Sequence, residues 1–353
     1  MQENKTILVA PLHWGLGHAT RCIPIINALI ENDYTPLLAS DGAALELLRN
    51  EFPNLEFIEL PSYQITYAKK ASGFKWKLLF DSPKMLKAIN EEKKIVKQLV
   101  SEGRIHGIIS DNRLGVRNKR VPSAFITHQL NVLTGNTTWL STKMHLDIIK
   151  KFDACWVPDI EGVGSLSGKL GHPEKLPENV KYIGPLSRMK KRQLDKKYDI
   201  LVLLSGPEPQ RTILEEKLML ELKNSEKKIL FVLGKVEEKK HTYNEENFRV
   251  YNFMSSKALE KAINESEVVI SRSGYTTIMD LAVLEKKAFF IPTPGQFEQE
   301  YLAKRLKTLG MVPSCKQDNF NIEKLDNIAV FKGLKSPGTN MDLKSIFSLF
   351  EGK

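Results

Sequence analysis

Short apolar runs, many of them β-branched, recur along the chain and are separated by longer stretches with helical periodicity. In the first half these runs occupy residues 6–10, 35–39, 55–60, 105–110, 123–127 and 154–158. The pattern restarts at residues 198–204 and continues through 268–270 and 288–291. Runs without polar alternation are typical of strands buried on both faces of a parallel sheet. The chain is therefore predicted to be an α/β protein with two doubly wound, Rossmann-like domains that face each other across a cleft.

The boundary between the two domains is predicted from length and composition. A chain of 353 residues exceeds the size that one hydrophobic core usually supports. After Gly184 and Pro185 the sequence becomes basic and polar between Arg188 and Arg192, as is typical of a linker. We expect an N-terminal domain of residues 1–186 and a C-terminal domain of residues 187–353.

Residues 268–302 contain the most informative polar pattern. The apolar run at 268–270 ends in a turn and a predicted helix, whose polar or small residues are Arg272, Ser273, Gly274, Thr276, Thr277 and Asp280. Gly274 would allow close approach of the backbone, and the free N–H groups at a helix start favour an anion. Asp280 is spaced to accept hydrogen bonds from a ribose diol. The turn is therefore a predicted phosphate site at the carboxyl end of a strand.

A second polar cluster follows the run at 288–291. It comprises Pro292, Thr293, Pro294, Gly295, Gln296, Gln299 and Glu300. Because the carboxyl ends of parallel strands are where open α/β sheets bind ligands, we expect both clusters at one site. The alternative is an ordinary strand–helix–strand unit with polar caps.

The first strand runs into a glycine-rich turn that contains Gly15, Gly17 and His18. The third glycine of a dinucleotide fingerprint is missing, so a nicotinamide-binding fold is the weaker interpretation. His18 is a candidate general base, since a histidine with a pKa near neutrality can accept a proton from a hydroxyl group. Alternatively, His18 holds the turn as a helix cap. His13 is expected to pack or cap.

Two further strands of the first half also end in polar residues, which are Asp111, Asn112 and Arg113 after the first and His128 and Gln129 after the second. Asp111 is the second candidate base, because a dry site can raise the pKa of a carboxylate. Its alternative role is a cap that pairs with Arg113.

Charge adds a hypothesis about partners. The net charge is +10, and many lysines between residues 68 and 99 interleave with aromatic and apolar residues. Such a segment suits an anionic membrane surface, although solvated helices with an ordinary buried face give the same pattern. We recognise no nucleic-acid-binding module. Without a signal peptide, a spanning segment or a paired cysteine pattern, a cytoplasmic protein is expected, with peripheral association at the inner face of the membrane as an option.

Residues 268–302 resemble the donor-binding half of the GT-B glycosyltransferases of family 28, the group that includes MurG. The resemblance implies that Ser273, Gly274 and Thr277 hold the diphosphate of a UDP-sugar, and that Asp280 holds the ribose where the family usually has Glu. Gln299 and Glu300 match the pair that contacts the sugar. The Gly15–Gly17–His18 turn is similar to the G-x-G-H turn of the same family and would face the reacting groups.

The resemblance extends to two further loops and to the end of the chain. Ser205 and Gly206 match the second phosphate loop, in which two prolines remove N–H donors and Arg211 could supply charge instead. Phe253 and Met254 lie where the family contacts the uracil, although Phe253 also suits a core. The amphipathic residues 343–350 are expected to cross back onto the first domain, as in GT-B enzymes.

The function implied is an inverting, metal-independent transfer of a sugar, N-acetylglucosamine by resemblance, from a UDP-sugar to a hydroxyl acceptor. The acceptor is expected to be a lipid-linked or cell-envelope glycan, bound near Asn112, Arg113, His128 and Gln129. No cofactor is expected, and no D-x-D motif indicates a metal. Arg272 or Arg211 would neutralise the leaving diphosphate. A UDP-sugar 2-epimerase and a non-catalytic nucleotide-sugar-binding protein remain alternatives.

Overall fold

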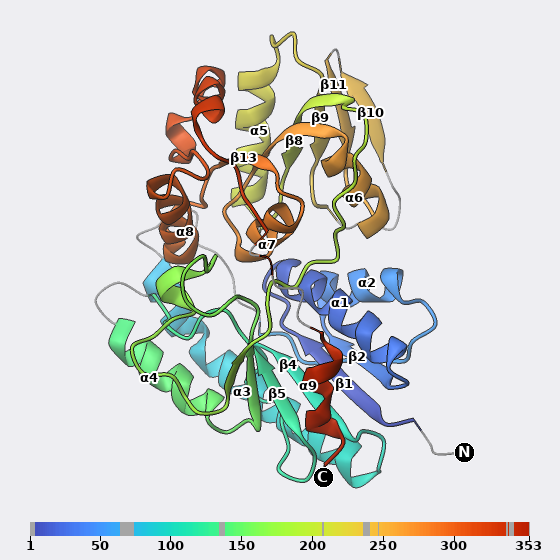
Figure 1. Ribbon diagram of the computed structural model, residues 1–353. Coiled ribbons are helices and arrows are strands. Elements are labelled where there is room, and N and C mark those ends of the chain that lie inside the picture. Colours follow the sequence, from blue (N-terminus) through green and yellow to red (C-terminus); the bar gives the residue numbers. More distant parts are fainter. Residues whose placement is uncertain are drawn as a thin grey trace. The chain divides into compact units, whose positions relative to one another are not determined.

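The computed structural model describes residues 4–63, 74–133, 138–206, 208–235, 241–245, 247–336, 338 and 342–352. The chain divides into two compact units (Figure 1). The first unit comprises Met1–Ile65, Leu78–Ser187 and Pro337–Lys353, and the second comprises Thr66–Lys77 and Arg188–Ser336. Each unit has its own sheet with helices between the strands, which confirms the predicted α/β class.

The first unit alternates strands and helices in the predicted way. Its elements are β1 (Thr6–Pro11), α1 (Gly17–Glu31), β2 (Thr35–Ser40), α2 (Gly42–Glu51), β3 (Phe57–Glu59), α3 (Phe74–Ser101), β4 (Gly107–Asp111), β5 (Ser123–Ile126), α4 (Thr138–Ile149), β6 (Ala154–Val157), η3 (Gly168–Leu170) and β7 (Val180–Tyr182). The strand order is β3-β2-β1-β4-β5-β6-β7, and every pairing is parallel. The carboxyl ends of all these strands therefore lie at one edge of the sheet.

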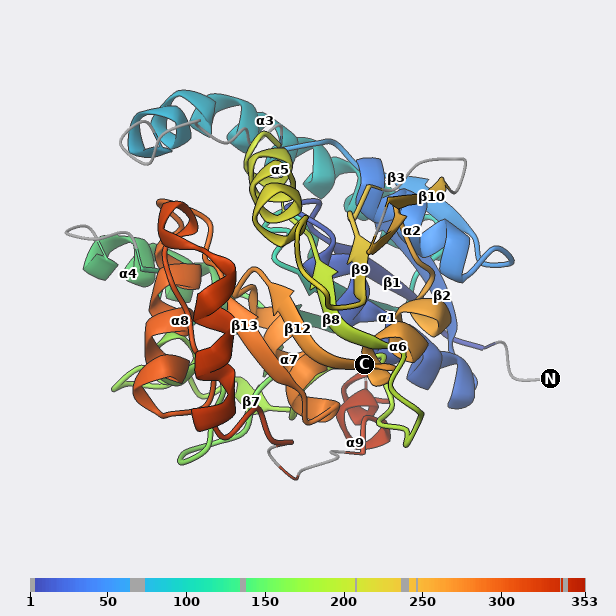
Figure 2. The same ribbon diagram turned by 90° about the horizontal axis from the view of Figure 1, so that it is seen from above.

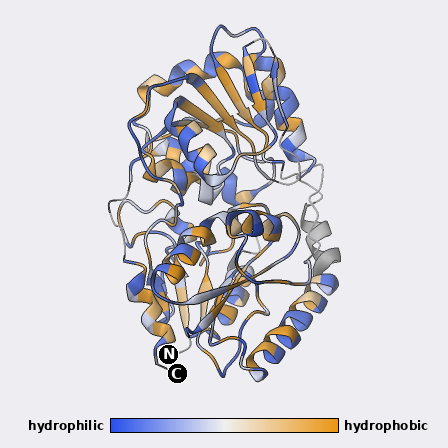
Figure 3. Cartoon of the chain, turned by 90° about the vertical axis from the view of Figure 1, so that its right-hand side faces the viewer, coloured by the Kyte–Doolittle hydropathy of each residue, from blue (hydrophilic) through white to orange (hydrophobic). Residues whose placement is uncertain are grey.

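The core of the first unit explains why its strands could be recognised. Ile7, Leu8, Val9 and Ala10 of β1 are fully buried, because helices cover both faces of the sheet. The hydropathy colouring in Figure 3 shows strands that are hydrophobic and helices that turn a hydrophilic face outward.

The second unit also alternates strands and helices, but its sheet has an antiparallel strand at one side. Its elements are β8 (Tyr198–Leu203), α5 (Gln210–Leu222), β9 (Ile229–Val232), β10 (Thr242–Glu245), β11 (Phe248–Tyr251), α6 (Ser256–Asn264), β12 (Ser266–Ser271), α7 (Tyr275–Val283), β13 (Lys287–Phe290), α8 (Phe297–Thr308), η4 (Gln317–Asn319) and η5 (Ile322–Val330). The order is β10-β11-β9-β8-β12-β13, with all pairs parallel except β10 and β11. In Figure 2, α5 lies on one face of this sheet and α6 and α7 lie on the other.

The chain ends in the first unit with α9 (Lys344–Phe347) and η6 (Ser348–Phe350). Phe347 and Phe350 are about 1% exposed and pack against Tyr34 and Trp156, with ring centroids 5.8–6.5 Å apart. The Lys5 Nζ donates a hydrogen bond to the Phe350 carbonyl at 2.6 Å. Residues at the two ends of the sequence thus belong to one core.

Within the described residues, no helix is both long enough and apolar enough to cross a lipid bilayer.

Candidate active site

The turn after β1 places His18 at the carboxyl edge of the first sheet. Leu12 N–H donates to the Asp111 carbonyl at 2.9 Å, so the chain continues beside β4 before it turns. Gly15 has φ +81°, a left-handed conformation that glycine adopts without strain. Helix α1 then begins at Gly17, with His18 in its first turn. The local sequence therefore fixes both the turn and the direction of the His18 side chain.

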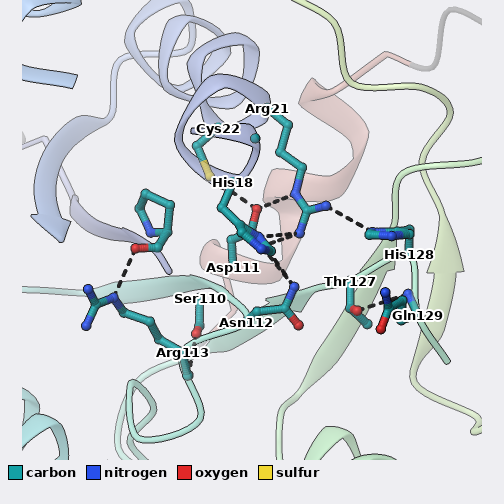
Figure 4. Close-up of polar contacts among 12 residues, drawn as sticks. His18, Arg21, Cys22, Ser110, Asp111, Asn112, Arg113, Thr127, His128 and Gln129 are labelled. Atoms are coloured by element: carbon teal, nitrogen blue, oxygen red, sulfur yellow. Dashed lines mark hydrogen bonds and ion pairs between the residues drawn. The ribbon is translucent and has the colours of Figure 1, made fainter. Parts of the chain in front are cut away.

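His18 and Asp111 form a hydrogen-bonded pair (Figure 4). The distance from His18 Nδ1 to Asp111 Oδ1 is 2.7 Å, and the Asn112 amide lies 3.3 Å from the same carboxylate oxygen. In the tautomer that donates from Nδ1 to the carboxylate, Nε2 carries the lone pair. Nε2 makes no hydrogen bond within the described part of the chain, and the His18 side chain is 15% exposed. The pair can therefore present a proton acceptor to a ligand.

Arg21, one helical turn after His18, holds this pair in place. Its guanidinium is buried and donates from Nε and Nη2 to the two oxygens of the Asp111 carboxylate. The Nη1 group lies 3.1 Å from His128 Nδ1. These contacts of Arg21 were not predicted from the sequence. Its spacing of three residues from His18 on a helix was the signal that could have indicated it.

The electrostatics assign different roles to His18 and Asp111. Burial lowers the pKa of His18, and the neighbouring Arg21 charge lowers it further, whereas Asp111 raises it. Burial would raise the pKa of Asp111, but the charges of Arg21 and His18 outweigh it and hold that pKa well below its usual range. Asp111 is thus a permanent anion with no exposed surface, and His18 is neutral near pH 7. Of the two candidate bases, the geometry favours His18, oriented by Asp111.

Arg113 does not belong to this pair, which corrects two expectations. The side chain is fully buried and donates to Glu92 at 2.8 Å, to Asp41, and to the Pro11 and Pro61 carbonyls. Asp111 is therefore not a cap paired with Arg113, and Arg113 is not available to an acceptor. Figure 4 shows it pointing away from His18. Sequence proximity misled the prediction because β4 ends at Asp111 and Asn112 has a left-handed φ of +59°, so residues 111 and 113 do not share a face as alternate residues of a strand do.

His128 and Gln129 lie after β5, beside the same group. His128 is 6% exposed and contacts the Arg21 guanidinium, so it is a buried neighbour of the His18–Asp111 pair. Gln129 is half-buried, and its backbone N–H donates to Thr127 Oγ1 at 3.1 Å. The first sheet thus brings together five of the six polar residues that were expected at its edge, namely His18, Asp111, Asn112, His128 and Gln129.

The second unit gathers its predicted residues at the carboxyl edge of its own sheet. Gly274 is the N-cap of α7, and Thr276, Thr277 and Asp280 are half-buried on the exposed side of that helix. Gly274 has φ −70°, which any residue can adopt, and a Cβ atom placed on it would meet nothing within 4 Å. Neither backbone strain nor packing in the described residues requires a glycine here. Glycine is a favoured N-cap residue, and its missing side chain also leaves room for a ligand to approach the backbone.

Polar side chains after β12 and β13 hold these loops together. Ser273 Oγ donates to the Gln299 carbonyl at 2.8 Å, and Gln299 Oε1 accepts from Thr293 N–H at 2.9 Å. Glu300 Oε1 accepts from Gly295 N–H at 3.0 Å, and Gln296 is the N-cap of α8. Ser273 and Gln299 are buried, and their hydrogen bonds connect the two loops. Glu300 is exposed.

The two arginines that were expected to neutralise the diphosphate have partners within the second unit. Arg272 is 1% exposed and donates to the carbonyls of Ile291, Pro292 and Gln210 and to Gln317 Oε1, at 2.7–3.1 Å. Burial lowers the pKa of Arg272 to about 9. Arg211 is paired with Glu208 and with Glu215. Both guanidinium groups thus tie loops of the second unit together, and neither is directed at a leaving group.

The remaining loops lie at the same edge. Ser205 and Gly206 follow β8, with φ +103° at Gly206, and Pro207 lies outside the described residues. After β11, the Asn252 side chain accepts hydrogen bonds from Phe253 N–H and His241 N–H, both at 2.9 Å. Phe253 is half-buried and Met254 is buried. Because β8, β11 and β12 are parallel members of one sheet, the loops after them lie at the same edge, with β9 between β11 and β8.

The second unit is similar to a known family. Residues 208–338 match the family model of the glycosyltransferase family 28 C-terminal domain. The predicted resemblance to family 28 is thereby confirmed for this region. A curated relative from Sulfurihydrogenibium sp., UDP-N-acetylglucosamine–N-acetylmuramyl-(pentapeptide) pyrophosphoryl-undecaprenol N-acetylglucosamine transferase, is 29% identical over 147 residues. That alignment covers 41% of this chain and 40% of the relative, less than half of its length.

Solved structures establish the fold of the whole chain. MurG of Acinetobacter baumannii superposes with a TM-score of 0.57 at 16% identity, over 99% of this chain and all of that protein. The glycotransferase of kitacinnamycin has a TM-score of 0.60 at 14% identity, over 99% and 96% of the two chains. A UDP-glucosyltransferase from Polygonum tinctorium gives 0.60 at 12% identity, over 99% of each chain. The predicted GT-B fold is confirmed.

Proposed function

We propose that this chain is a glycosyltransferase that moves a sugar from a UDP-sugar to a hydroxyl acceptor, with inversion and without a bound metal. The family 28 domain at residues 208–338, with the loops that it gathers at one sheet edge, is the observation that carries the proposal. N-acetylglucosamine is the proposed sugar and a lipid-linked cell-envelope glycan the proposed acceptor, because the curated relative is named for these substrates.

In this proposal His18 is the general base. Its Nε2 takes the proton from the acceptor hydroxyl as that oxygen forms a bond to the anomeric carbon of the sugar. The bond between that carbon and the diphosphate breaks, and UDP leaves with the electron pair. Asp111 holds Nδ1–H and stabilises the imidazolium, while Arg21 prevents the carboxylate from taking the proton itself.

The leaving diphosphate is assigned to the turn at Gly274. A helix N-terminus offers backbone N–H groups and a partial positive charge, and a glycine cap lets the phosphate oxygens come close. Thr277 and Asp280 follow on the same helix and are assigned to the phosphate and the ribose. Arg272 and Arg211 have no direct role in this scheme, since both bind other groups of the protein.

A product assay tests the proposal. Purified protein is incubated with UDP-N-acetylglucosamine, with and without a lipid-linked glycan acceptor, and UDP and sugar products are quantified. Release of UDP that depends on the acceptor and yields a new glycoside is expected. Release of the free C2 epimer without an acceptor would assign the 2-epimerase. Binding of UDP without any turnover would assign a non-catalytic binding protein.

For a lipid-linked acceptor, we propose that the first unit also binds an anionic membrane surface. Helix α4 is the proposed contact. Trp139, Leu140 and Met144 are 69%, 43% and 60% exposed, and Lys143 lies among them. An exposed cluster of apolar side chains with a cation is typical of helices at lipid interfaces.

The lysine-rich segment predicted for this role is described only in part. From Met85 to Ser101, helix α3 has an ordinary buried face with Ala88, Ile89, Val96 and Leu99, and its lysines face solvent. Residues 68–73 and the side chains of residues 74–82, including Lys75, Lys77 and Trp76, lie outside what the structure describes. Membrane binding by that part stays a prediction.

A further inference from the structure

The second unit contains a cavity of about 390 Å³ at the edge opposite its donor loops. The cavity lies at the amino ends of β8, β12 and β13, between the segment before β8 and the turns after α6 and α7. The charged residues that line it are Lys191, Arg192, Asp195, Lys196, Glu285 and Lys286. Four cations therefore face two carboxylates.

Two of these cations converge without an acidic partner. Lys196 Nζ donates to the Asn264 carbonyl at 2.7 Å, and Lys286 Nζ donates to the Ser266 carbonyl at 2.8 Å and lies 3.4 Å from the same Asn264 oxygen. In the described part of the chain neither amine lies within 4.0 Å of a carboxylate. Lys191 and Arg192 are different, because they pair with Glu285 and Glu260.

Buried and hydrogen-bonded residues form part of the cavity wall. Lys286 is 7% exposed and Asn264 is 1% exposed. The Asn264 side chain donates to the carbonyls of Lys190 and Glu260 and accepts from Arg192 N–H, at 2.9–3.0 Å, which anchors the segment that carries Lys196. Burial lowers the pKa of Lys286 to about 7, and the nearby Lys196 amine acts in the same direction. The Glu267 carboxylate acts in the opposite direction. Two protonated amines this close repel each other, and a bound anion would favour the protonated form of both.

We propose that this cavity binds a small phosphate-bearing anion between Lys196 and Lys286. Lysine is a common phosphate ligand that acts as a point charge, and the volume lies in the range of small-molecule sites, roughly 300–1,000 Å³. Phosphate oxygens would accept the amine hydrogens that the two carbonyls leave available. The site is separate from the donor loops, since the amino and carboxyl edges of a parallel sheet lie at its opposite ends. A phosphorylated metabolite could therefore bind the second unit together with a donor.

Thermal unfolding of the full chain tests the proposal, with inorganic phosphate and pyrophosphate as probes and chloride to hold ionic strength constant. Both probes are expected to raise the Tm of the wild type. The dependence of Tm on probe concentration gives an apparent affinity for each probe. Lys196→Ala should weaken this affinity by roughly tenfold, as for a lost charge-assisted hydrogen bond. Lys228→Ala, which removes an exposed lysine elsewhere in the second unit, should leave it unchanged.

Three outcomes would overturn the proposal. These are no stabilisation beyond that given by chloride, equal stabilisation of Lys196→Ala and the wild type, and a shift that saturating UDP abolishes. The last result would place the phosphate at the donor loops. Lys196 lies on an exposed segment, so its substitution is expected to leave the fold intact.

Discussion

Arg21 determines what its two neighbours can do. A carboxylate that accepts both arms of a buried guanidinium keeps its charge and binds a proton weakly, which favours His18 over Asp111 as the proposed base. The same carboxylate fixes the ring of His18 through Nδ1, and Nε2 makes no hydrogen bond within the described residues. The sequence allowed either residue to be the base, because it does not show which cation reaches which anion.

Replacing the base separates chemistry from donor binding. His18→Ala should lower kcat by roughly 10²–10⁴-fold, the usual contribution of a general base, with little change in UDP affinity because the donor is held by the second unit. Steady-state kinetics and UDP titration measure the two effects. His13→Ala is a matched control, since His13 also contacts an aspartate, Asp41, at 3.2 Å. Equal losses in both variants would remove His18 from the reaction.

The pH profile tests the role of Asp111. A base must be neutral to act, so the rate falls as pH drops through the His18 pKa, which lies below its ordinary value. Asp111→Asn removes a carboxylate that raises this pKa, so the acid limb of the profile should move to lower pH while kcat falls. Asp147→Asn on α4 is the control. An acid limb that stays in place would show that the carboxylate does not face the base.

At the level of single residues, prediction from sequence succeeded where a side chain follows directly from a strand end. Asp111 ends β4 and His128 lies just after β5, and the sheet brings them together with His18 at the start of α1. Arg113 was assigned wrongly because its partners, Asp41 and Glu92, are distant in the sequence. Arg21 was overlooked because a basic residue on a helix usually faces solvent.

At the level of elements, a substitution at the start of α7 can test UDP binding with little effect on stability. Gly274→Ala adds a methyl group to a backbone that accepts it, so the free energy of unfolding should stay within about 1 kcal/mol of the wild type. UDP binding should weaken by roughly 1–3 kcal/mol, because the methyl group displaces the diphosphate from the N–H groups. Urea unfolding and calorimetric titration measure the two quantities.

The control for this variant is Gly234→Ala. Gly234 has φ +69°, and an added Cβ would lie 2.4 Å from the Leu204 carbonyl oxygen, so that variant should lose stability. If Gly274→Ala binds UDP as tightly as the wild type, the diphosphate does not approach this turn.

Helix α4 offers a test of membrane association. Replacing Trp139 and Met144 with Ser should reduce binding to anionic vesicles at least about tenfold, because each apolar side chain contributes on the order of 1.5–3 kcal/mol when buried. Vesicle sedimentation measures the binding. Leu220→Ser is matched to these changes, since Leu220 is 75% exposed on α5 of the second unit. Equal binding of all variants would exclude α4 as the contact.

The strands differ in how clearly they can be predicted from the sequence. Strands β1 and β8 are continuous apolar runs, and their prediction follows from burial on both faces. The antiparallel hairpin of β10 and β11 was not foreseen, because β10 is a polar edge strand with the sequence Thr-Tyr-Asn-Glu. An edge strand has one pairing partner and often an open face, so its composition resembles that of a loop.

On the scale of the whole molecule, the C-terminal segment contributes to the stability of the first unit. Phe347→Ala should lower the free energy of unfolding of that unit by about 3–5 kcal/mol, the usual cost of removing a buried aromatic ring. Trp156 fluorescence during urea unfolding reports the change, because the two rings are 6.5 Å apart. Val330→Ala, at a side chain 80% exposed, is the control. An unchanged midpoint would mean that the segment is dispensable.

The return of residues 342–352 to the first unit imposes an order of events during synthesis. The ribosome releases the residues of the first sheet early, but Phe347 and Phe350 emerge only after the second unit. Until then the surface formed by Tyr34, Gly107 and Trp156 has no cover. A nascent first unit would expose this apolar patch while the second unit folds, and a chaperone that binds apolar surface would find its substrate there.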